Sequence, residues 1–172
     1  MGFFNRKTSK QTSRVKKLLK LALSRLAVAR RPRLARKSIS LSDVGQLLIL
    51  GHLHRALHRA EQVIEEDNML QAFDIIELYC KRLIDHAARL DKPHESGEEI
   101  MEAAAGIMFA ARWCGDLPEL LLDAPSLKTS SLVWKLAGDK TNMELKKKVT
   151  KEIATENNIL VDFSELQEAV KQ

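Results

Sequence analysis

The sequence predicts an all-α protein, and three observations lead to that prediction. Apolar residues make up 45% of the 172 residues, which is enough for one domain with a packed core. Glycine and proline, which interrupt helices, number only 7 and 4. Long stretches place apolar residues three and four positions apart, the spacing of one helix face, and no stretch predicts a strand.

Charge is distributed unevenly along the chain. Residues 1–42 contain 13 Lys or Arg and no carboxylate, because the first acidic residue is Asp43. The rest of the chain contains 15 basic and 23 acidic side chains, a net charge of −8. A basic segment of this kind favours an anionic partner, either a lipid surface, a nucleic acid or an acidic protein. The alternative is a solvated helix face that binds nothing.

The first long helix is expected to begin near Thr12, after a flexible basic lead at residues 1–11. We expect a break or kink at Pro32, because proline removes a backbone donor and clashes with the preceding turn. The helix then resumes and ends at Gly51, a residue suited to the left-handed conformation that follows many helices. Its apolar stripe consists of Val15, Leu18, Leu19, Ala22, Leu26, Ala29, Leu41, Val44 and Leu48.

A second long helix is predicted from about His52 to Ala88. Two long helices joined at one glycine must fold back on each other to bury their apolar stripes. The prediction is therefore a hairpin with one basic arm and one largely acidic arm. The acidic residues expected on the solvent face of the second arm are Glu61, Glu65, Glu66, Asp67, Asp74 and Glu77.

Shorter helices are predicted to follow the hairpin. A helix near residues 98–112 is apolar on all sides, which indicates burial, and Ser96 with Glu99 forms a capping box at its start. A short helix near Asp116, a linker at 123–131, a helix from Thr141 to about residue 156 and a last turn at 164–167 complete the chain. We expect one helical domain at residues 12–160 and a C-terminal extension at 161–172.

Motifs for catalysis or metal binding are incomplete. His54 and His58 are four residues apart, with His52 nearby, but a third ligand and the glutamate of a metalloprotease helix are missing. Cys80 and Cys114 have no C-x-x-C partner, and their apolar surroundings indicate buried, reduced thiols. The sequence also has no Gly-rich phosphate loop and no nucleophile elbow. We therefore expect no enzyme activity, no metal and no cofactor.

An anionic membrane is favoured over nucleic acid as the partner of the basic segment. No aromatic residue lies between Arg14 and Lys37, so bases could not stack there. For a membrane, basic side chains on one helix face are sufficient, at about 1 kcal/mol each. The other readings left open are a helical nucleic-acid-binding protein and a generic protein-interaction module. The predicted contact residues for a membrane or an acidic partner are Arg14, Lys16, Lys17, Lys20 and Arg25.

Several blocks of the chain resemble one known family, the Ist family of ESCRT-III regulators. The central block is specific, because charged and cysteine positions match it as well as apolar ones. Together the matching blocks span about residues 14–160. They are Arg25-Leu26, Gly51, the run from Ala56 to Asp67, Ala72 with Ile75 or Ile76, Glu77-Leu78-Tyr79-Cys80, Leu83, Ala110 to Cys114, Asp116 to Leu120, Leu132-Val133, Lys135-Leu136 and Lys151 to Ala154.

The resemblance implies an ESCRT-III-like fold, in which shorter helices pack across a long two-helix hairpin. It also implies a cytoplasmic protein, peripheral on endosomes, that acts in multivesicular body formation. The implied partners are ESCRT-III subunits of the charged multivesicular body protein class, with which such proteins co-assemble into homo- or heteropolymers on membranes. Glu61, Glu65, Glu66 and Asp67 would then support hairpin packing or contacts between subunits.

Three features depart from the family pattern. Pro32 lies in what is usually one uninterrupted helix, and the stretch between Leu120 and Leu132 is short. The family usually ends in leucine-rich motifs that dock into MIT domains, and the region around Leu166 is a poor match to them. Direct binding to the AAA ATPase that dismantles the filaments, or to its MIT-domain cofactor, is therefore the weakest of the implied interactions.

Overall fold

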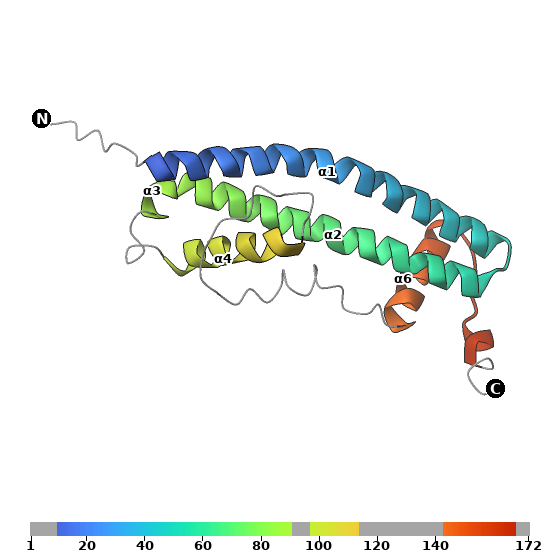
Figure 1. Cartoon of the computed structure of the whole chain (residues 1–172). Coiled ribbons are helices and arrows are strands. Elements are labelled where there is room, and N and C mark those ends of the chain that lie inside the picture. Colours follow the sequence, from blue (N-terminus) through green and yellow to red (C-terminus); the bar gives the residue numbers. More distant parts are fainter. Residues whose placement is uncertain (1–9, 91–96, 114–142, 168–172) are drawn as a thin grey trace, which may run out of the picture. The chain divides into compact units, whose positions relative to one another are not determined.

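The computed structural model describes residues 10–90, 97–113 and 143–167, and the regular structure in these ranges is entirely helical (Figure 1). The all-α prediction is therefore confirmed. The predicted cap at Ser96, the helix near Asp116, the linker at 123–131, Thr141 and Cys114 lie outside the described residues. In chain order the elements are α1 (Lys10–Ile49), α2 (Leu53–Asp85), α3 (Ala87–Leu90), α4 (Glu98–Trp113), α6 (Met143–Glu156) and the 3₁₀ helix η3 (Ser164–Gln167).

Helices α1 and α2 form the predicted hairpin, and the turn between them is set by Gly51. This glycine has φ of 74°, the left-handed conformation that glycine adopts without steric cost. Its N–H donates to the carbonyl of Leu48 at 3.0 Å, and the N–H of His52 donates to the carbonyl of Leu47 at 2.8 Å. This pair of bonds is the Schellman motif, which satisfies the last carbonyls of α1 and reverses the chain.

Of the two possibilities expected at Pro32, a break or a kink, the break is wrong, because α1 runs through this residue as one helix of 40 residues. An interior proline leaves the carbonyl four residues earlier without its helical donor. That carbonyl belongs to Val28, and the side chains of Val28 and Pro32 are both exposed, so solvent can supply the missing hydrogen bond. The helix also begins two residues before the predicted Thr12. Helix α2 ends at Asp85, before the predicted Ala88, and α3 follows directly.

The described residues belong to two compact units, each of which contains part of both hairpin helices. The first unit comprises residues 1–30 and 71–137, and the second comprises residues 31–70 and 138–172. In the first unit, the buried apolar side chains come from α1, α2 and α4. The largest of them are Leu19, Leu26, Phe73, Ile76 and Ile107.

Within the first unit, α4 approaches α2 closely at Gly106. A Cβ atom on this residue would overlap the ring of Tyr79, lying 2.6 Å from its Cδ2 atom. One turn earlier on α4, Glu102 accepts a hydrogen bond from the Tyr79 hydroxyl at 2.9 Å. Glycine is therefore required here by the packing of an aromatic ring rather than by backbone conformation.

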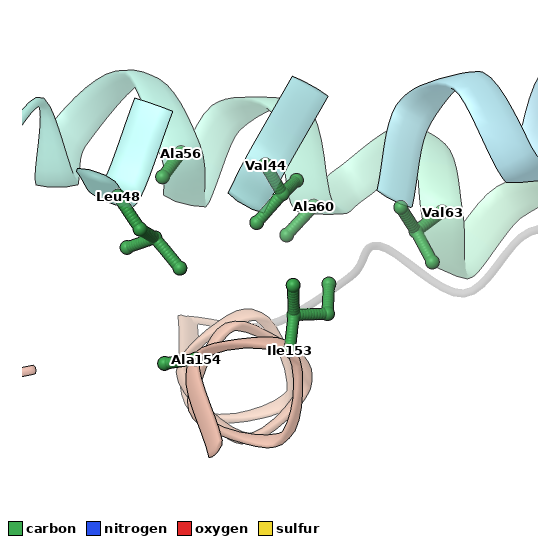
Figure 2. Close-up of a cluster of buried hydrophobic side chains, with 7 residues drawn as sticks. All are labelled: Val44, Leu48, Ala56, Ala60, Val63, Ile153 and Ala154. Carbon is green, nitrogen blue, oxygen red and sulfur yellow. The ribbon is translucent and has the colours of Figure 1, made fainter. Parts of the chain in front are cut away.

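In the second unit, α6 packs across both arms of the hairpin (Figure 2). The two arms contribute alanine, valine and leucine side chains to this contact. Gly45 of α1 also lies against the end of α6, since a Cβ atom there would be 3.3 Å from Nδ2 of Asn157. The buried cluster consists of Val44 and Leu48 from α1, Ala56, Ala60 and Val63 from α2, and Ile153 and Ala154 from α6.

A second Schellman motif ends α6. Asn158 has φ of 57°, and the N–H of Ile159 donates to the carbonyl of Ala154 at 2.8 Å. After this turn, Ile159 and Val161 pack against the buried cluster. The predicted last turn is confirmed as η3, at whose start Asp162 Oδ1 accepts a hydrogen bond from the Ser164 N–H at 2.9 Å.

Candidate functional site

The C-terminal half of α1 directs four of its five basic side chains toward acidic side chains of α2, and the fifth, Arg31, is exposed. In the first unit, Arg30 contacts Asp74 at 2.5 Å through Nη1 and Glu77 at 2.7 Å through Nη2. In the second unit, Lys37 Nζ contacts Asp67 Oδ1 at 2.6 Å. These pairs join the two arms of the hairpin within each unit, so these cations are occupied inside the protein.

Glu66 is the most deeply buried of the paired acids. Its side chain is only 8% exposed, and its two oxygens accept from Arg36 Nε at 2.7 Å and from Arg33 Nη1 at 3.2 Å. A buried carboxylate without its partners would cost several kcal/mol, because its hydration is lost. We therefore name Arg30, Arg33, Arg36 and Lys37 the inward cations, and their role is to hold the hairpin arms together.

The N-terminal half of α1 presents a different surface. The side chains of Arg14, Lys17 and Lys20 are exposed and that of Lys16 is half-buried, and within the described residues none of the four forms an ion pair. Arg25 is also exposed. Positions 14, 17, 21, 25 and 28 recur at helical spacing and lie along one face. Of the predicted residues, Arg14, Lys17 and Arg25 lie on this face, whereas Lys16 and Lys20 lie on the adjoining side of the helix. We name all five together, Arg14, Lys16, Lys17, Lys20 and Arg25, the outward cationic face.

Two apolar side chains share that face and were not predicted as part of it. Leu21 is 46% exposed and Val28 is 64% exposed, and they lie two turns apart on α1. Their exposure could have been inferred from the sequence, because the two residues lie seven positions apart and neither belongs to the apolar stripe of the first helix. A helix face that combines basic and exposed apolar side chains is typical of contact with a membrane surface.

The four acidic residues predicted as contact or packing residues occupy different environments. Glu61 Oε2 accepts from Lys146 Nζ of α6 at 3.0 Å, and Asp67 pairs with Lys37, whereas Glu65 is exposed. The expectation of an open acidic surface is wrong for Glu66, which is buried. Its position could have been inferred, because it follows the buried Val63 by three residues and precedes the buried Leu70 by four.

Two side chains of the first unit, Glu77 and Cys80, have shifted pKa values. A hydrogen bond from Lys81, aided by the charges of Lys81 and Arg30, holds the pKa of Glu77 below its usual value. Burial raises the pKa of the Cys80 thiol to about 12, so it remains a neutral thiol rather than the nucleophilic thiolate.

The described residues contain neither a metal-binding cluster nor a membrane-spanning helix. In those ranges, no three His, Cys, Asp or Glu side chains lie close enough together to hold a metal ion. None of the described helices is both long and apolar enough to cross a bilayer.

One known protein family has a sequence model that matches this chain. The family model of Ist1, described as "Regulator of Vps4 activity in the MVB pathway", matches residues 16–127. The chain belongs to the Ist1 family. The matched range contains four residues of the outward cationic face and all four acidic residues discussed above; Arg14 precedes it.

The sequence and the solved N-terminal domain of yeast Ist1 show how far the likeness extends. "Vacuolar protein sorting-associated protein IST1" of Saccharomyces cerevisiae is 28% identical, and the alignment covers 73% of this chain and 43% of that protein. The chain thus spans less than half the length of this curated relative. The crystal structure of the S. cerevisiae Ist1 N-terminal domain, solved in complex with the Did2 MIM motif, matches with a TM-score of 0.75 and 22% identity. That match covers 88% of this chain and 94% of the yeast domain, and it confirms the Ist1-type fold.

Proposed function

We propose that this chain is a non-enzymatic adaptor of endosomal sorting that binds ESCRT-III subunits and an anionic membrane. In this role it is cytoplasmic, peripheral on endosomes, and modulates the assembly and disassembly of ESCRT-III filaments. Membership of the Ist1 family supports the role in the multivesicular body pathway. Support for an ESCRT-III partner comes from the fold, which matches a yeast Ist1 domain whose structure contains the Did2 MIM motif.

The observation that carries the membrane part is the outward cationic face. The inward cations are occupied by acids of α2, whereas Arg14, Lys16, Lys17 and Lys20 form no ion pair within the described residues. Each basic side chain held near an anionic leaflet contributes about 1 kcal/mol, so four or five give useful but salt-sensitive binding. Exposed Leu21 and Val28 favour a lipid surface, because a purely ionic partner gives them no apolar contact.

Binding of an ESCRT-III subunit is tested by titration calorimetry. The probe is the C-terminal tail peptide of a charged multivesicular body protein, and the control is a peptide of the same composition in scrambled order. We expect micromolar affinity for the native peptide only. Absence of binding, in a sample shown by circular dichroism to be helical, would contradict the ESCRT-III part of the proposal.

Membrane binding is tested by sedimentation with vesicles of phosphatidylserine and phosphatidylcholine at physiological salt. Replacing all five residues of the outward cationic face by Glu should abolish sedimentation and leave the helical content unchanged. A vesicle-bound five-residue variant would show that the proposed face is wrong. Short duplex DNA serves as a competitor, and efficient displacement of the chain from vesicles would favour a nucleic acid as the partner.

A charge-matched pair of triple variants distinguishes an effect of the outward cationic face on vesicle binding from an effect of net charge. One variant replaces Arg14, Lys17 and Lys20 by Glu, and the other replaces Arg55, Lys148 and Lys151 by Glu. The three control residues are exposed and form no ion pair within the described ranges. Both variants change the net charge equally, but only the first should lose vesicle binding.

A further inference from the structure

Ser13 is an exposed hydroxyl group at the beginning of the outward cationic face. It is the fourth residue of α1, and its neighbour Thr12 is only 2% exposed. Among the described residues, none forms a hydrogen bond with the Ser13 hydroxyl. Ser13 is therefore an accessible nucleophilic side chain of α1 that the proposed function does not use.

The side chains around Ser13 are basic in both directions along the helix. Lys10 lies three residues before it, Arg14 follows it, and Lys16 and Lys17 lie three and four residues after it. Residues three and four apart on a helix are neighbours on its surface. The part of α1 that precedes Asp43 contains no carboxylate. A serine flanked by cations on both sides is the sequence context that basophilic protein kinases select.

We infer that Ser13 is a phosphorylation site that switches the outward cationic face off. In this step a kinase transfers the terminal phosphoryl group of ATP to Oγ of Ser13, so that the new Oγ–P bond replaces the bond to ADP and the hydroxyl proton is released. The phosphate adds close to two negative charges at neutral pH. Two cations of the face are thereby neutralised. The regulatory consequence rests on the proposed membrane binding, whereas the modification itself does not.

The modification is compatible with the folded hairpin. The first turn of α1 contains no acidic residue, although the N–H groups at a helix start favour negative charge. A phosphate at Ser13 adds the missing negative charge beside Lys16 and Lys17. We therefore expect phosphorylation to stabilise the first turn while it weakens vesicle binding.

Ser24 provides a matched comparison on the same helix. It is exposed and lies next to Arg25, but its Oγ donates to the carbonyl of Lys20 at 3.2 Å. It also lies well inside α1, where the backbone must unfold before a kinase can bind it as an extended segment. Helix ends open at much lower cost than helix interiors. We therefore expect a kinase to modify Ser13 and not Ser24.

The test treats the full chain with a basophilic kinase of the protein kinase C class and ATP, and mass spectrometry locates the phosphate. Ser13→Ala and Ser24→Ala are the matched variants. We expect one phosphate at Ser13, its loss in Ser13→Ala and its retention in Ser24→Ala. The affinity for phosphatidylserine vesicles should fall about thirty-fold, from neutralisation of about two cations. The midpoint of thermal unfolding should be unchanged or higher.

Three results would overturn the inference. The first is absence of phosphate at Ser13, the second is modification of Ser24 in its place, and the third is a phosphorylated chain that binds vesicles as tightly as the unmodified one. If the unmodified chain fails to bind vesicles, the membrane part of the proposed function fails and the switch fails with it. In that case the mass spectrum and the thermal midpoint still decide whether Ser13 is a modification site.

Discussion

The two parts of α1 contain the same kinds of basic residue but place them in different environments. Between Arg14 and Lys20, three of the four basic side chains are exposed, and none forms an ion pair within the described residues. Between Arg30 and Lys37, the inward cations contact acids of α2 at 2.5–3.2 Å. The difference lies in the opposite helix, because α2 places its paired acids only beside the second part. A high density of basic residues along a helix therefore identifies a binding surface only after the residues that form ion pairs within the protein have been excluded.

The largest effect is expected from the double variant Arg33→Gln/Arg36→Gln. It leaves the carboxylate of Glu66, 8% exposed, without both cationic partners. Removing the partners of a buried charge costs about 3–5 kcal/mol, and the partial exposure of both arginines places the expected loss near the lower limit. Urea denaturation at neutral pH measures the free energy of unfolding. A loss under about 1 kcal/mol would show that Glu66 is hydrated or paired elsewhere.

A smaller effect, independent of charge, is expected from Gly106→Ala in the first unit. The added methyl group would overlap the ring of Tyr79, which is itself buried, so the ring or α4 must move. Overpacking of this kind costs about 1–3 kcal/mol. Gly97→Ala is the control, since its Cβ atom would meet nothing within 4 Å. Equal stability of the two variants would contradict the close approach of α4 to α2.

Tyr79 gives the first unit a specific dependence on pH. Burial, followed by the hydrogen bond to Glu102, raises the pKa of Tyr79 to about 12 from its ordinary value of 10.0. Because the folded state disfavours tyrosinate, the stability due to neutral Tyr79 is complete below pH 10 and is lost as the pH rises from about 10 to about 12. The chain contains one tyrosine, so tyrosinate absorbance follows this residue alone. Titration near pH 10 in a folded sample would contradict the prediction.

The smallest effect on stability is expected from Lys17→Gln/Lys20→Gln. This variant removes the same charge from α1 as the arginine pair does. Both lysines are exposed and form no ion pair within the described ranges, so the free energy of unfolding should change by less than about 0.5 kcal/mol. Urea denaturation under the conditions used for the arginine pair provides the comparison. A loss as large as that of the arginine pair would remove the distinction between the two parts of α1.

The sequence was sufficient to predict most helices, because each prediction depended on residues close together in the chain. The apolar stripe of the first helix and the glycine at its end predicted the hairpin turn at Gly51. The capping box and apolar residues of 98–112 located α4, and the start signal at Thr141 located α6, each within two residues. The helix continues through Pro32 for a physical reason, because a proline exposed on the outer side of a long helix leaves a carbonyl that water can satisfy.

Contacts between helices were harder to predict. The acids from Glu61 to Asp67 were treated as one solvent face, but their environments depend on which α1 residue lies opposite each of them. Arg33 and Arg36 form ion pairs with Glu66, whereas the neighbouring residue Glu65 is exposed. The close approach at Gly106 likewise depends on a ring from another helix. Predicting such pairings requires the register of one helix against another. The periodicity of apolar residues within one helix does not give that register.

The central claim is that the outward cations bind a partner and the inward cations hold the fold, and one paired measurement tests it most directly. The variants Lys17→Gln/Lys20→Gln and Arg33→Gln/Arg36→Gln, which carry equal net charge, are compared for binding to phosphatidylserine vesicles at physiological salt and at a temperature where both are folded. The account predicts that the lysine pair lowers vesicle affinity about thirty-fold. The arginine pair should bind nearly as the unchanged protein does, although its free energy of unfolding is lower. Equal loss of vesicle affinity in both variants would show that net charge alone governs binding and would contradict the account.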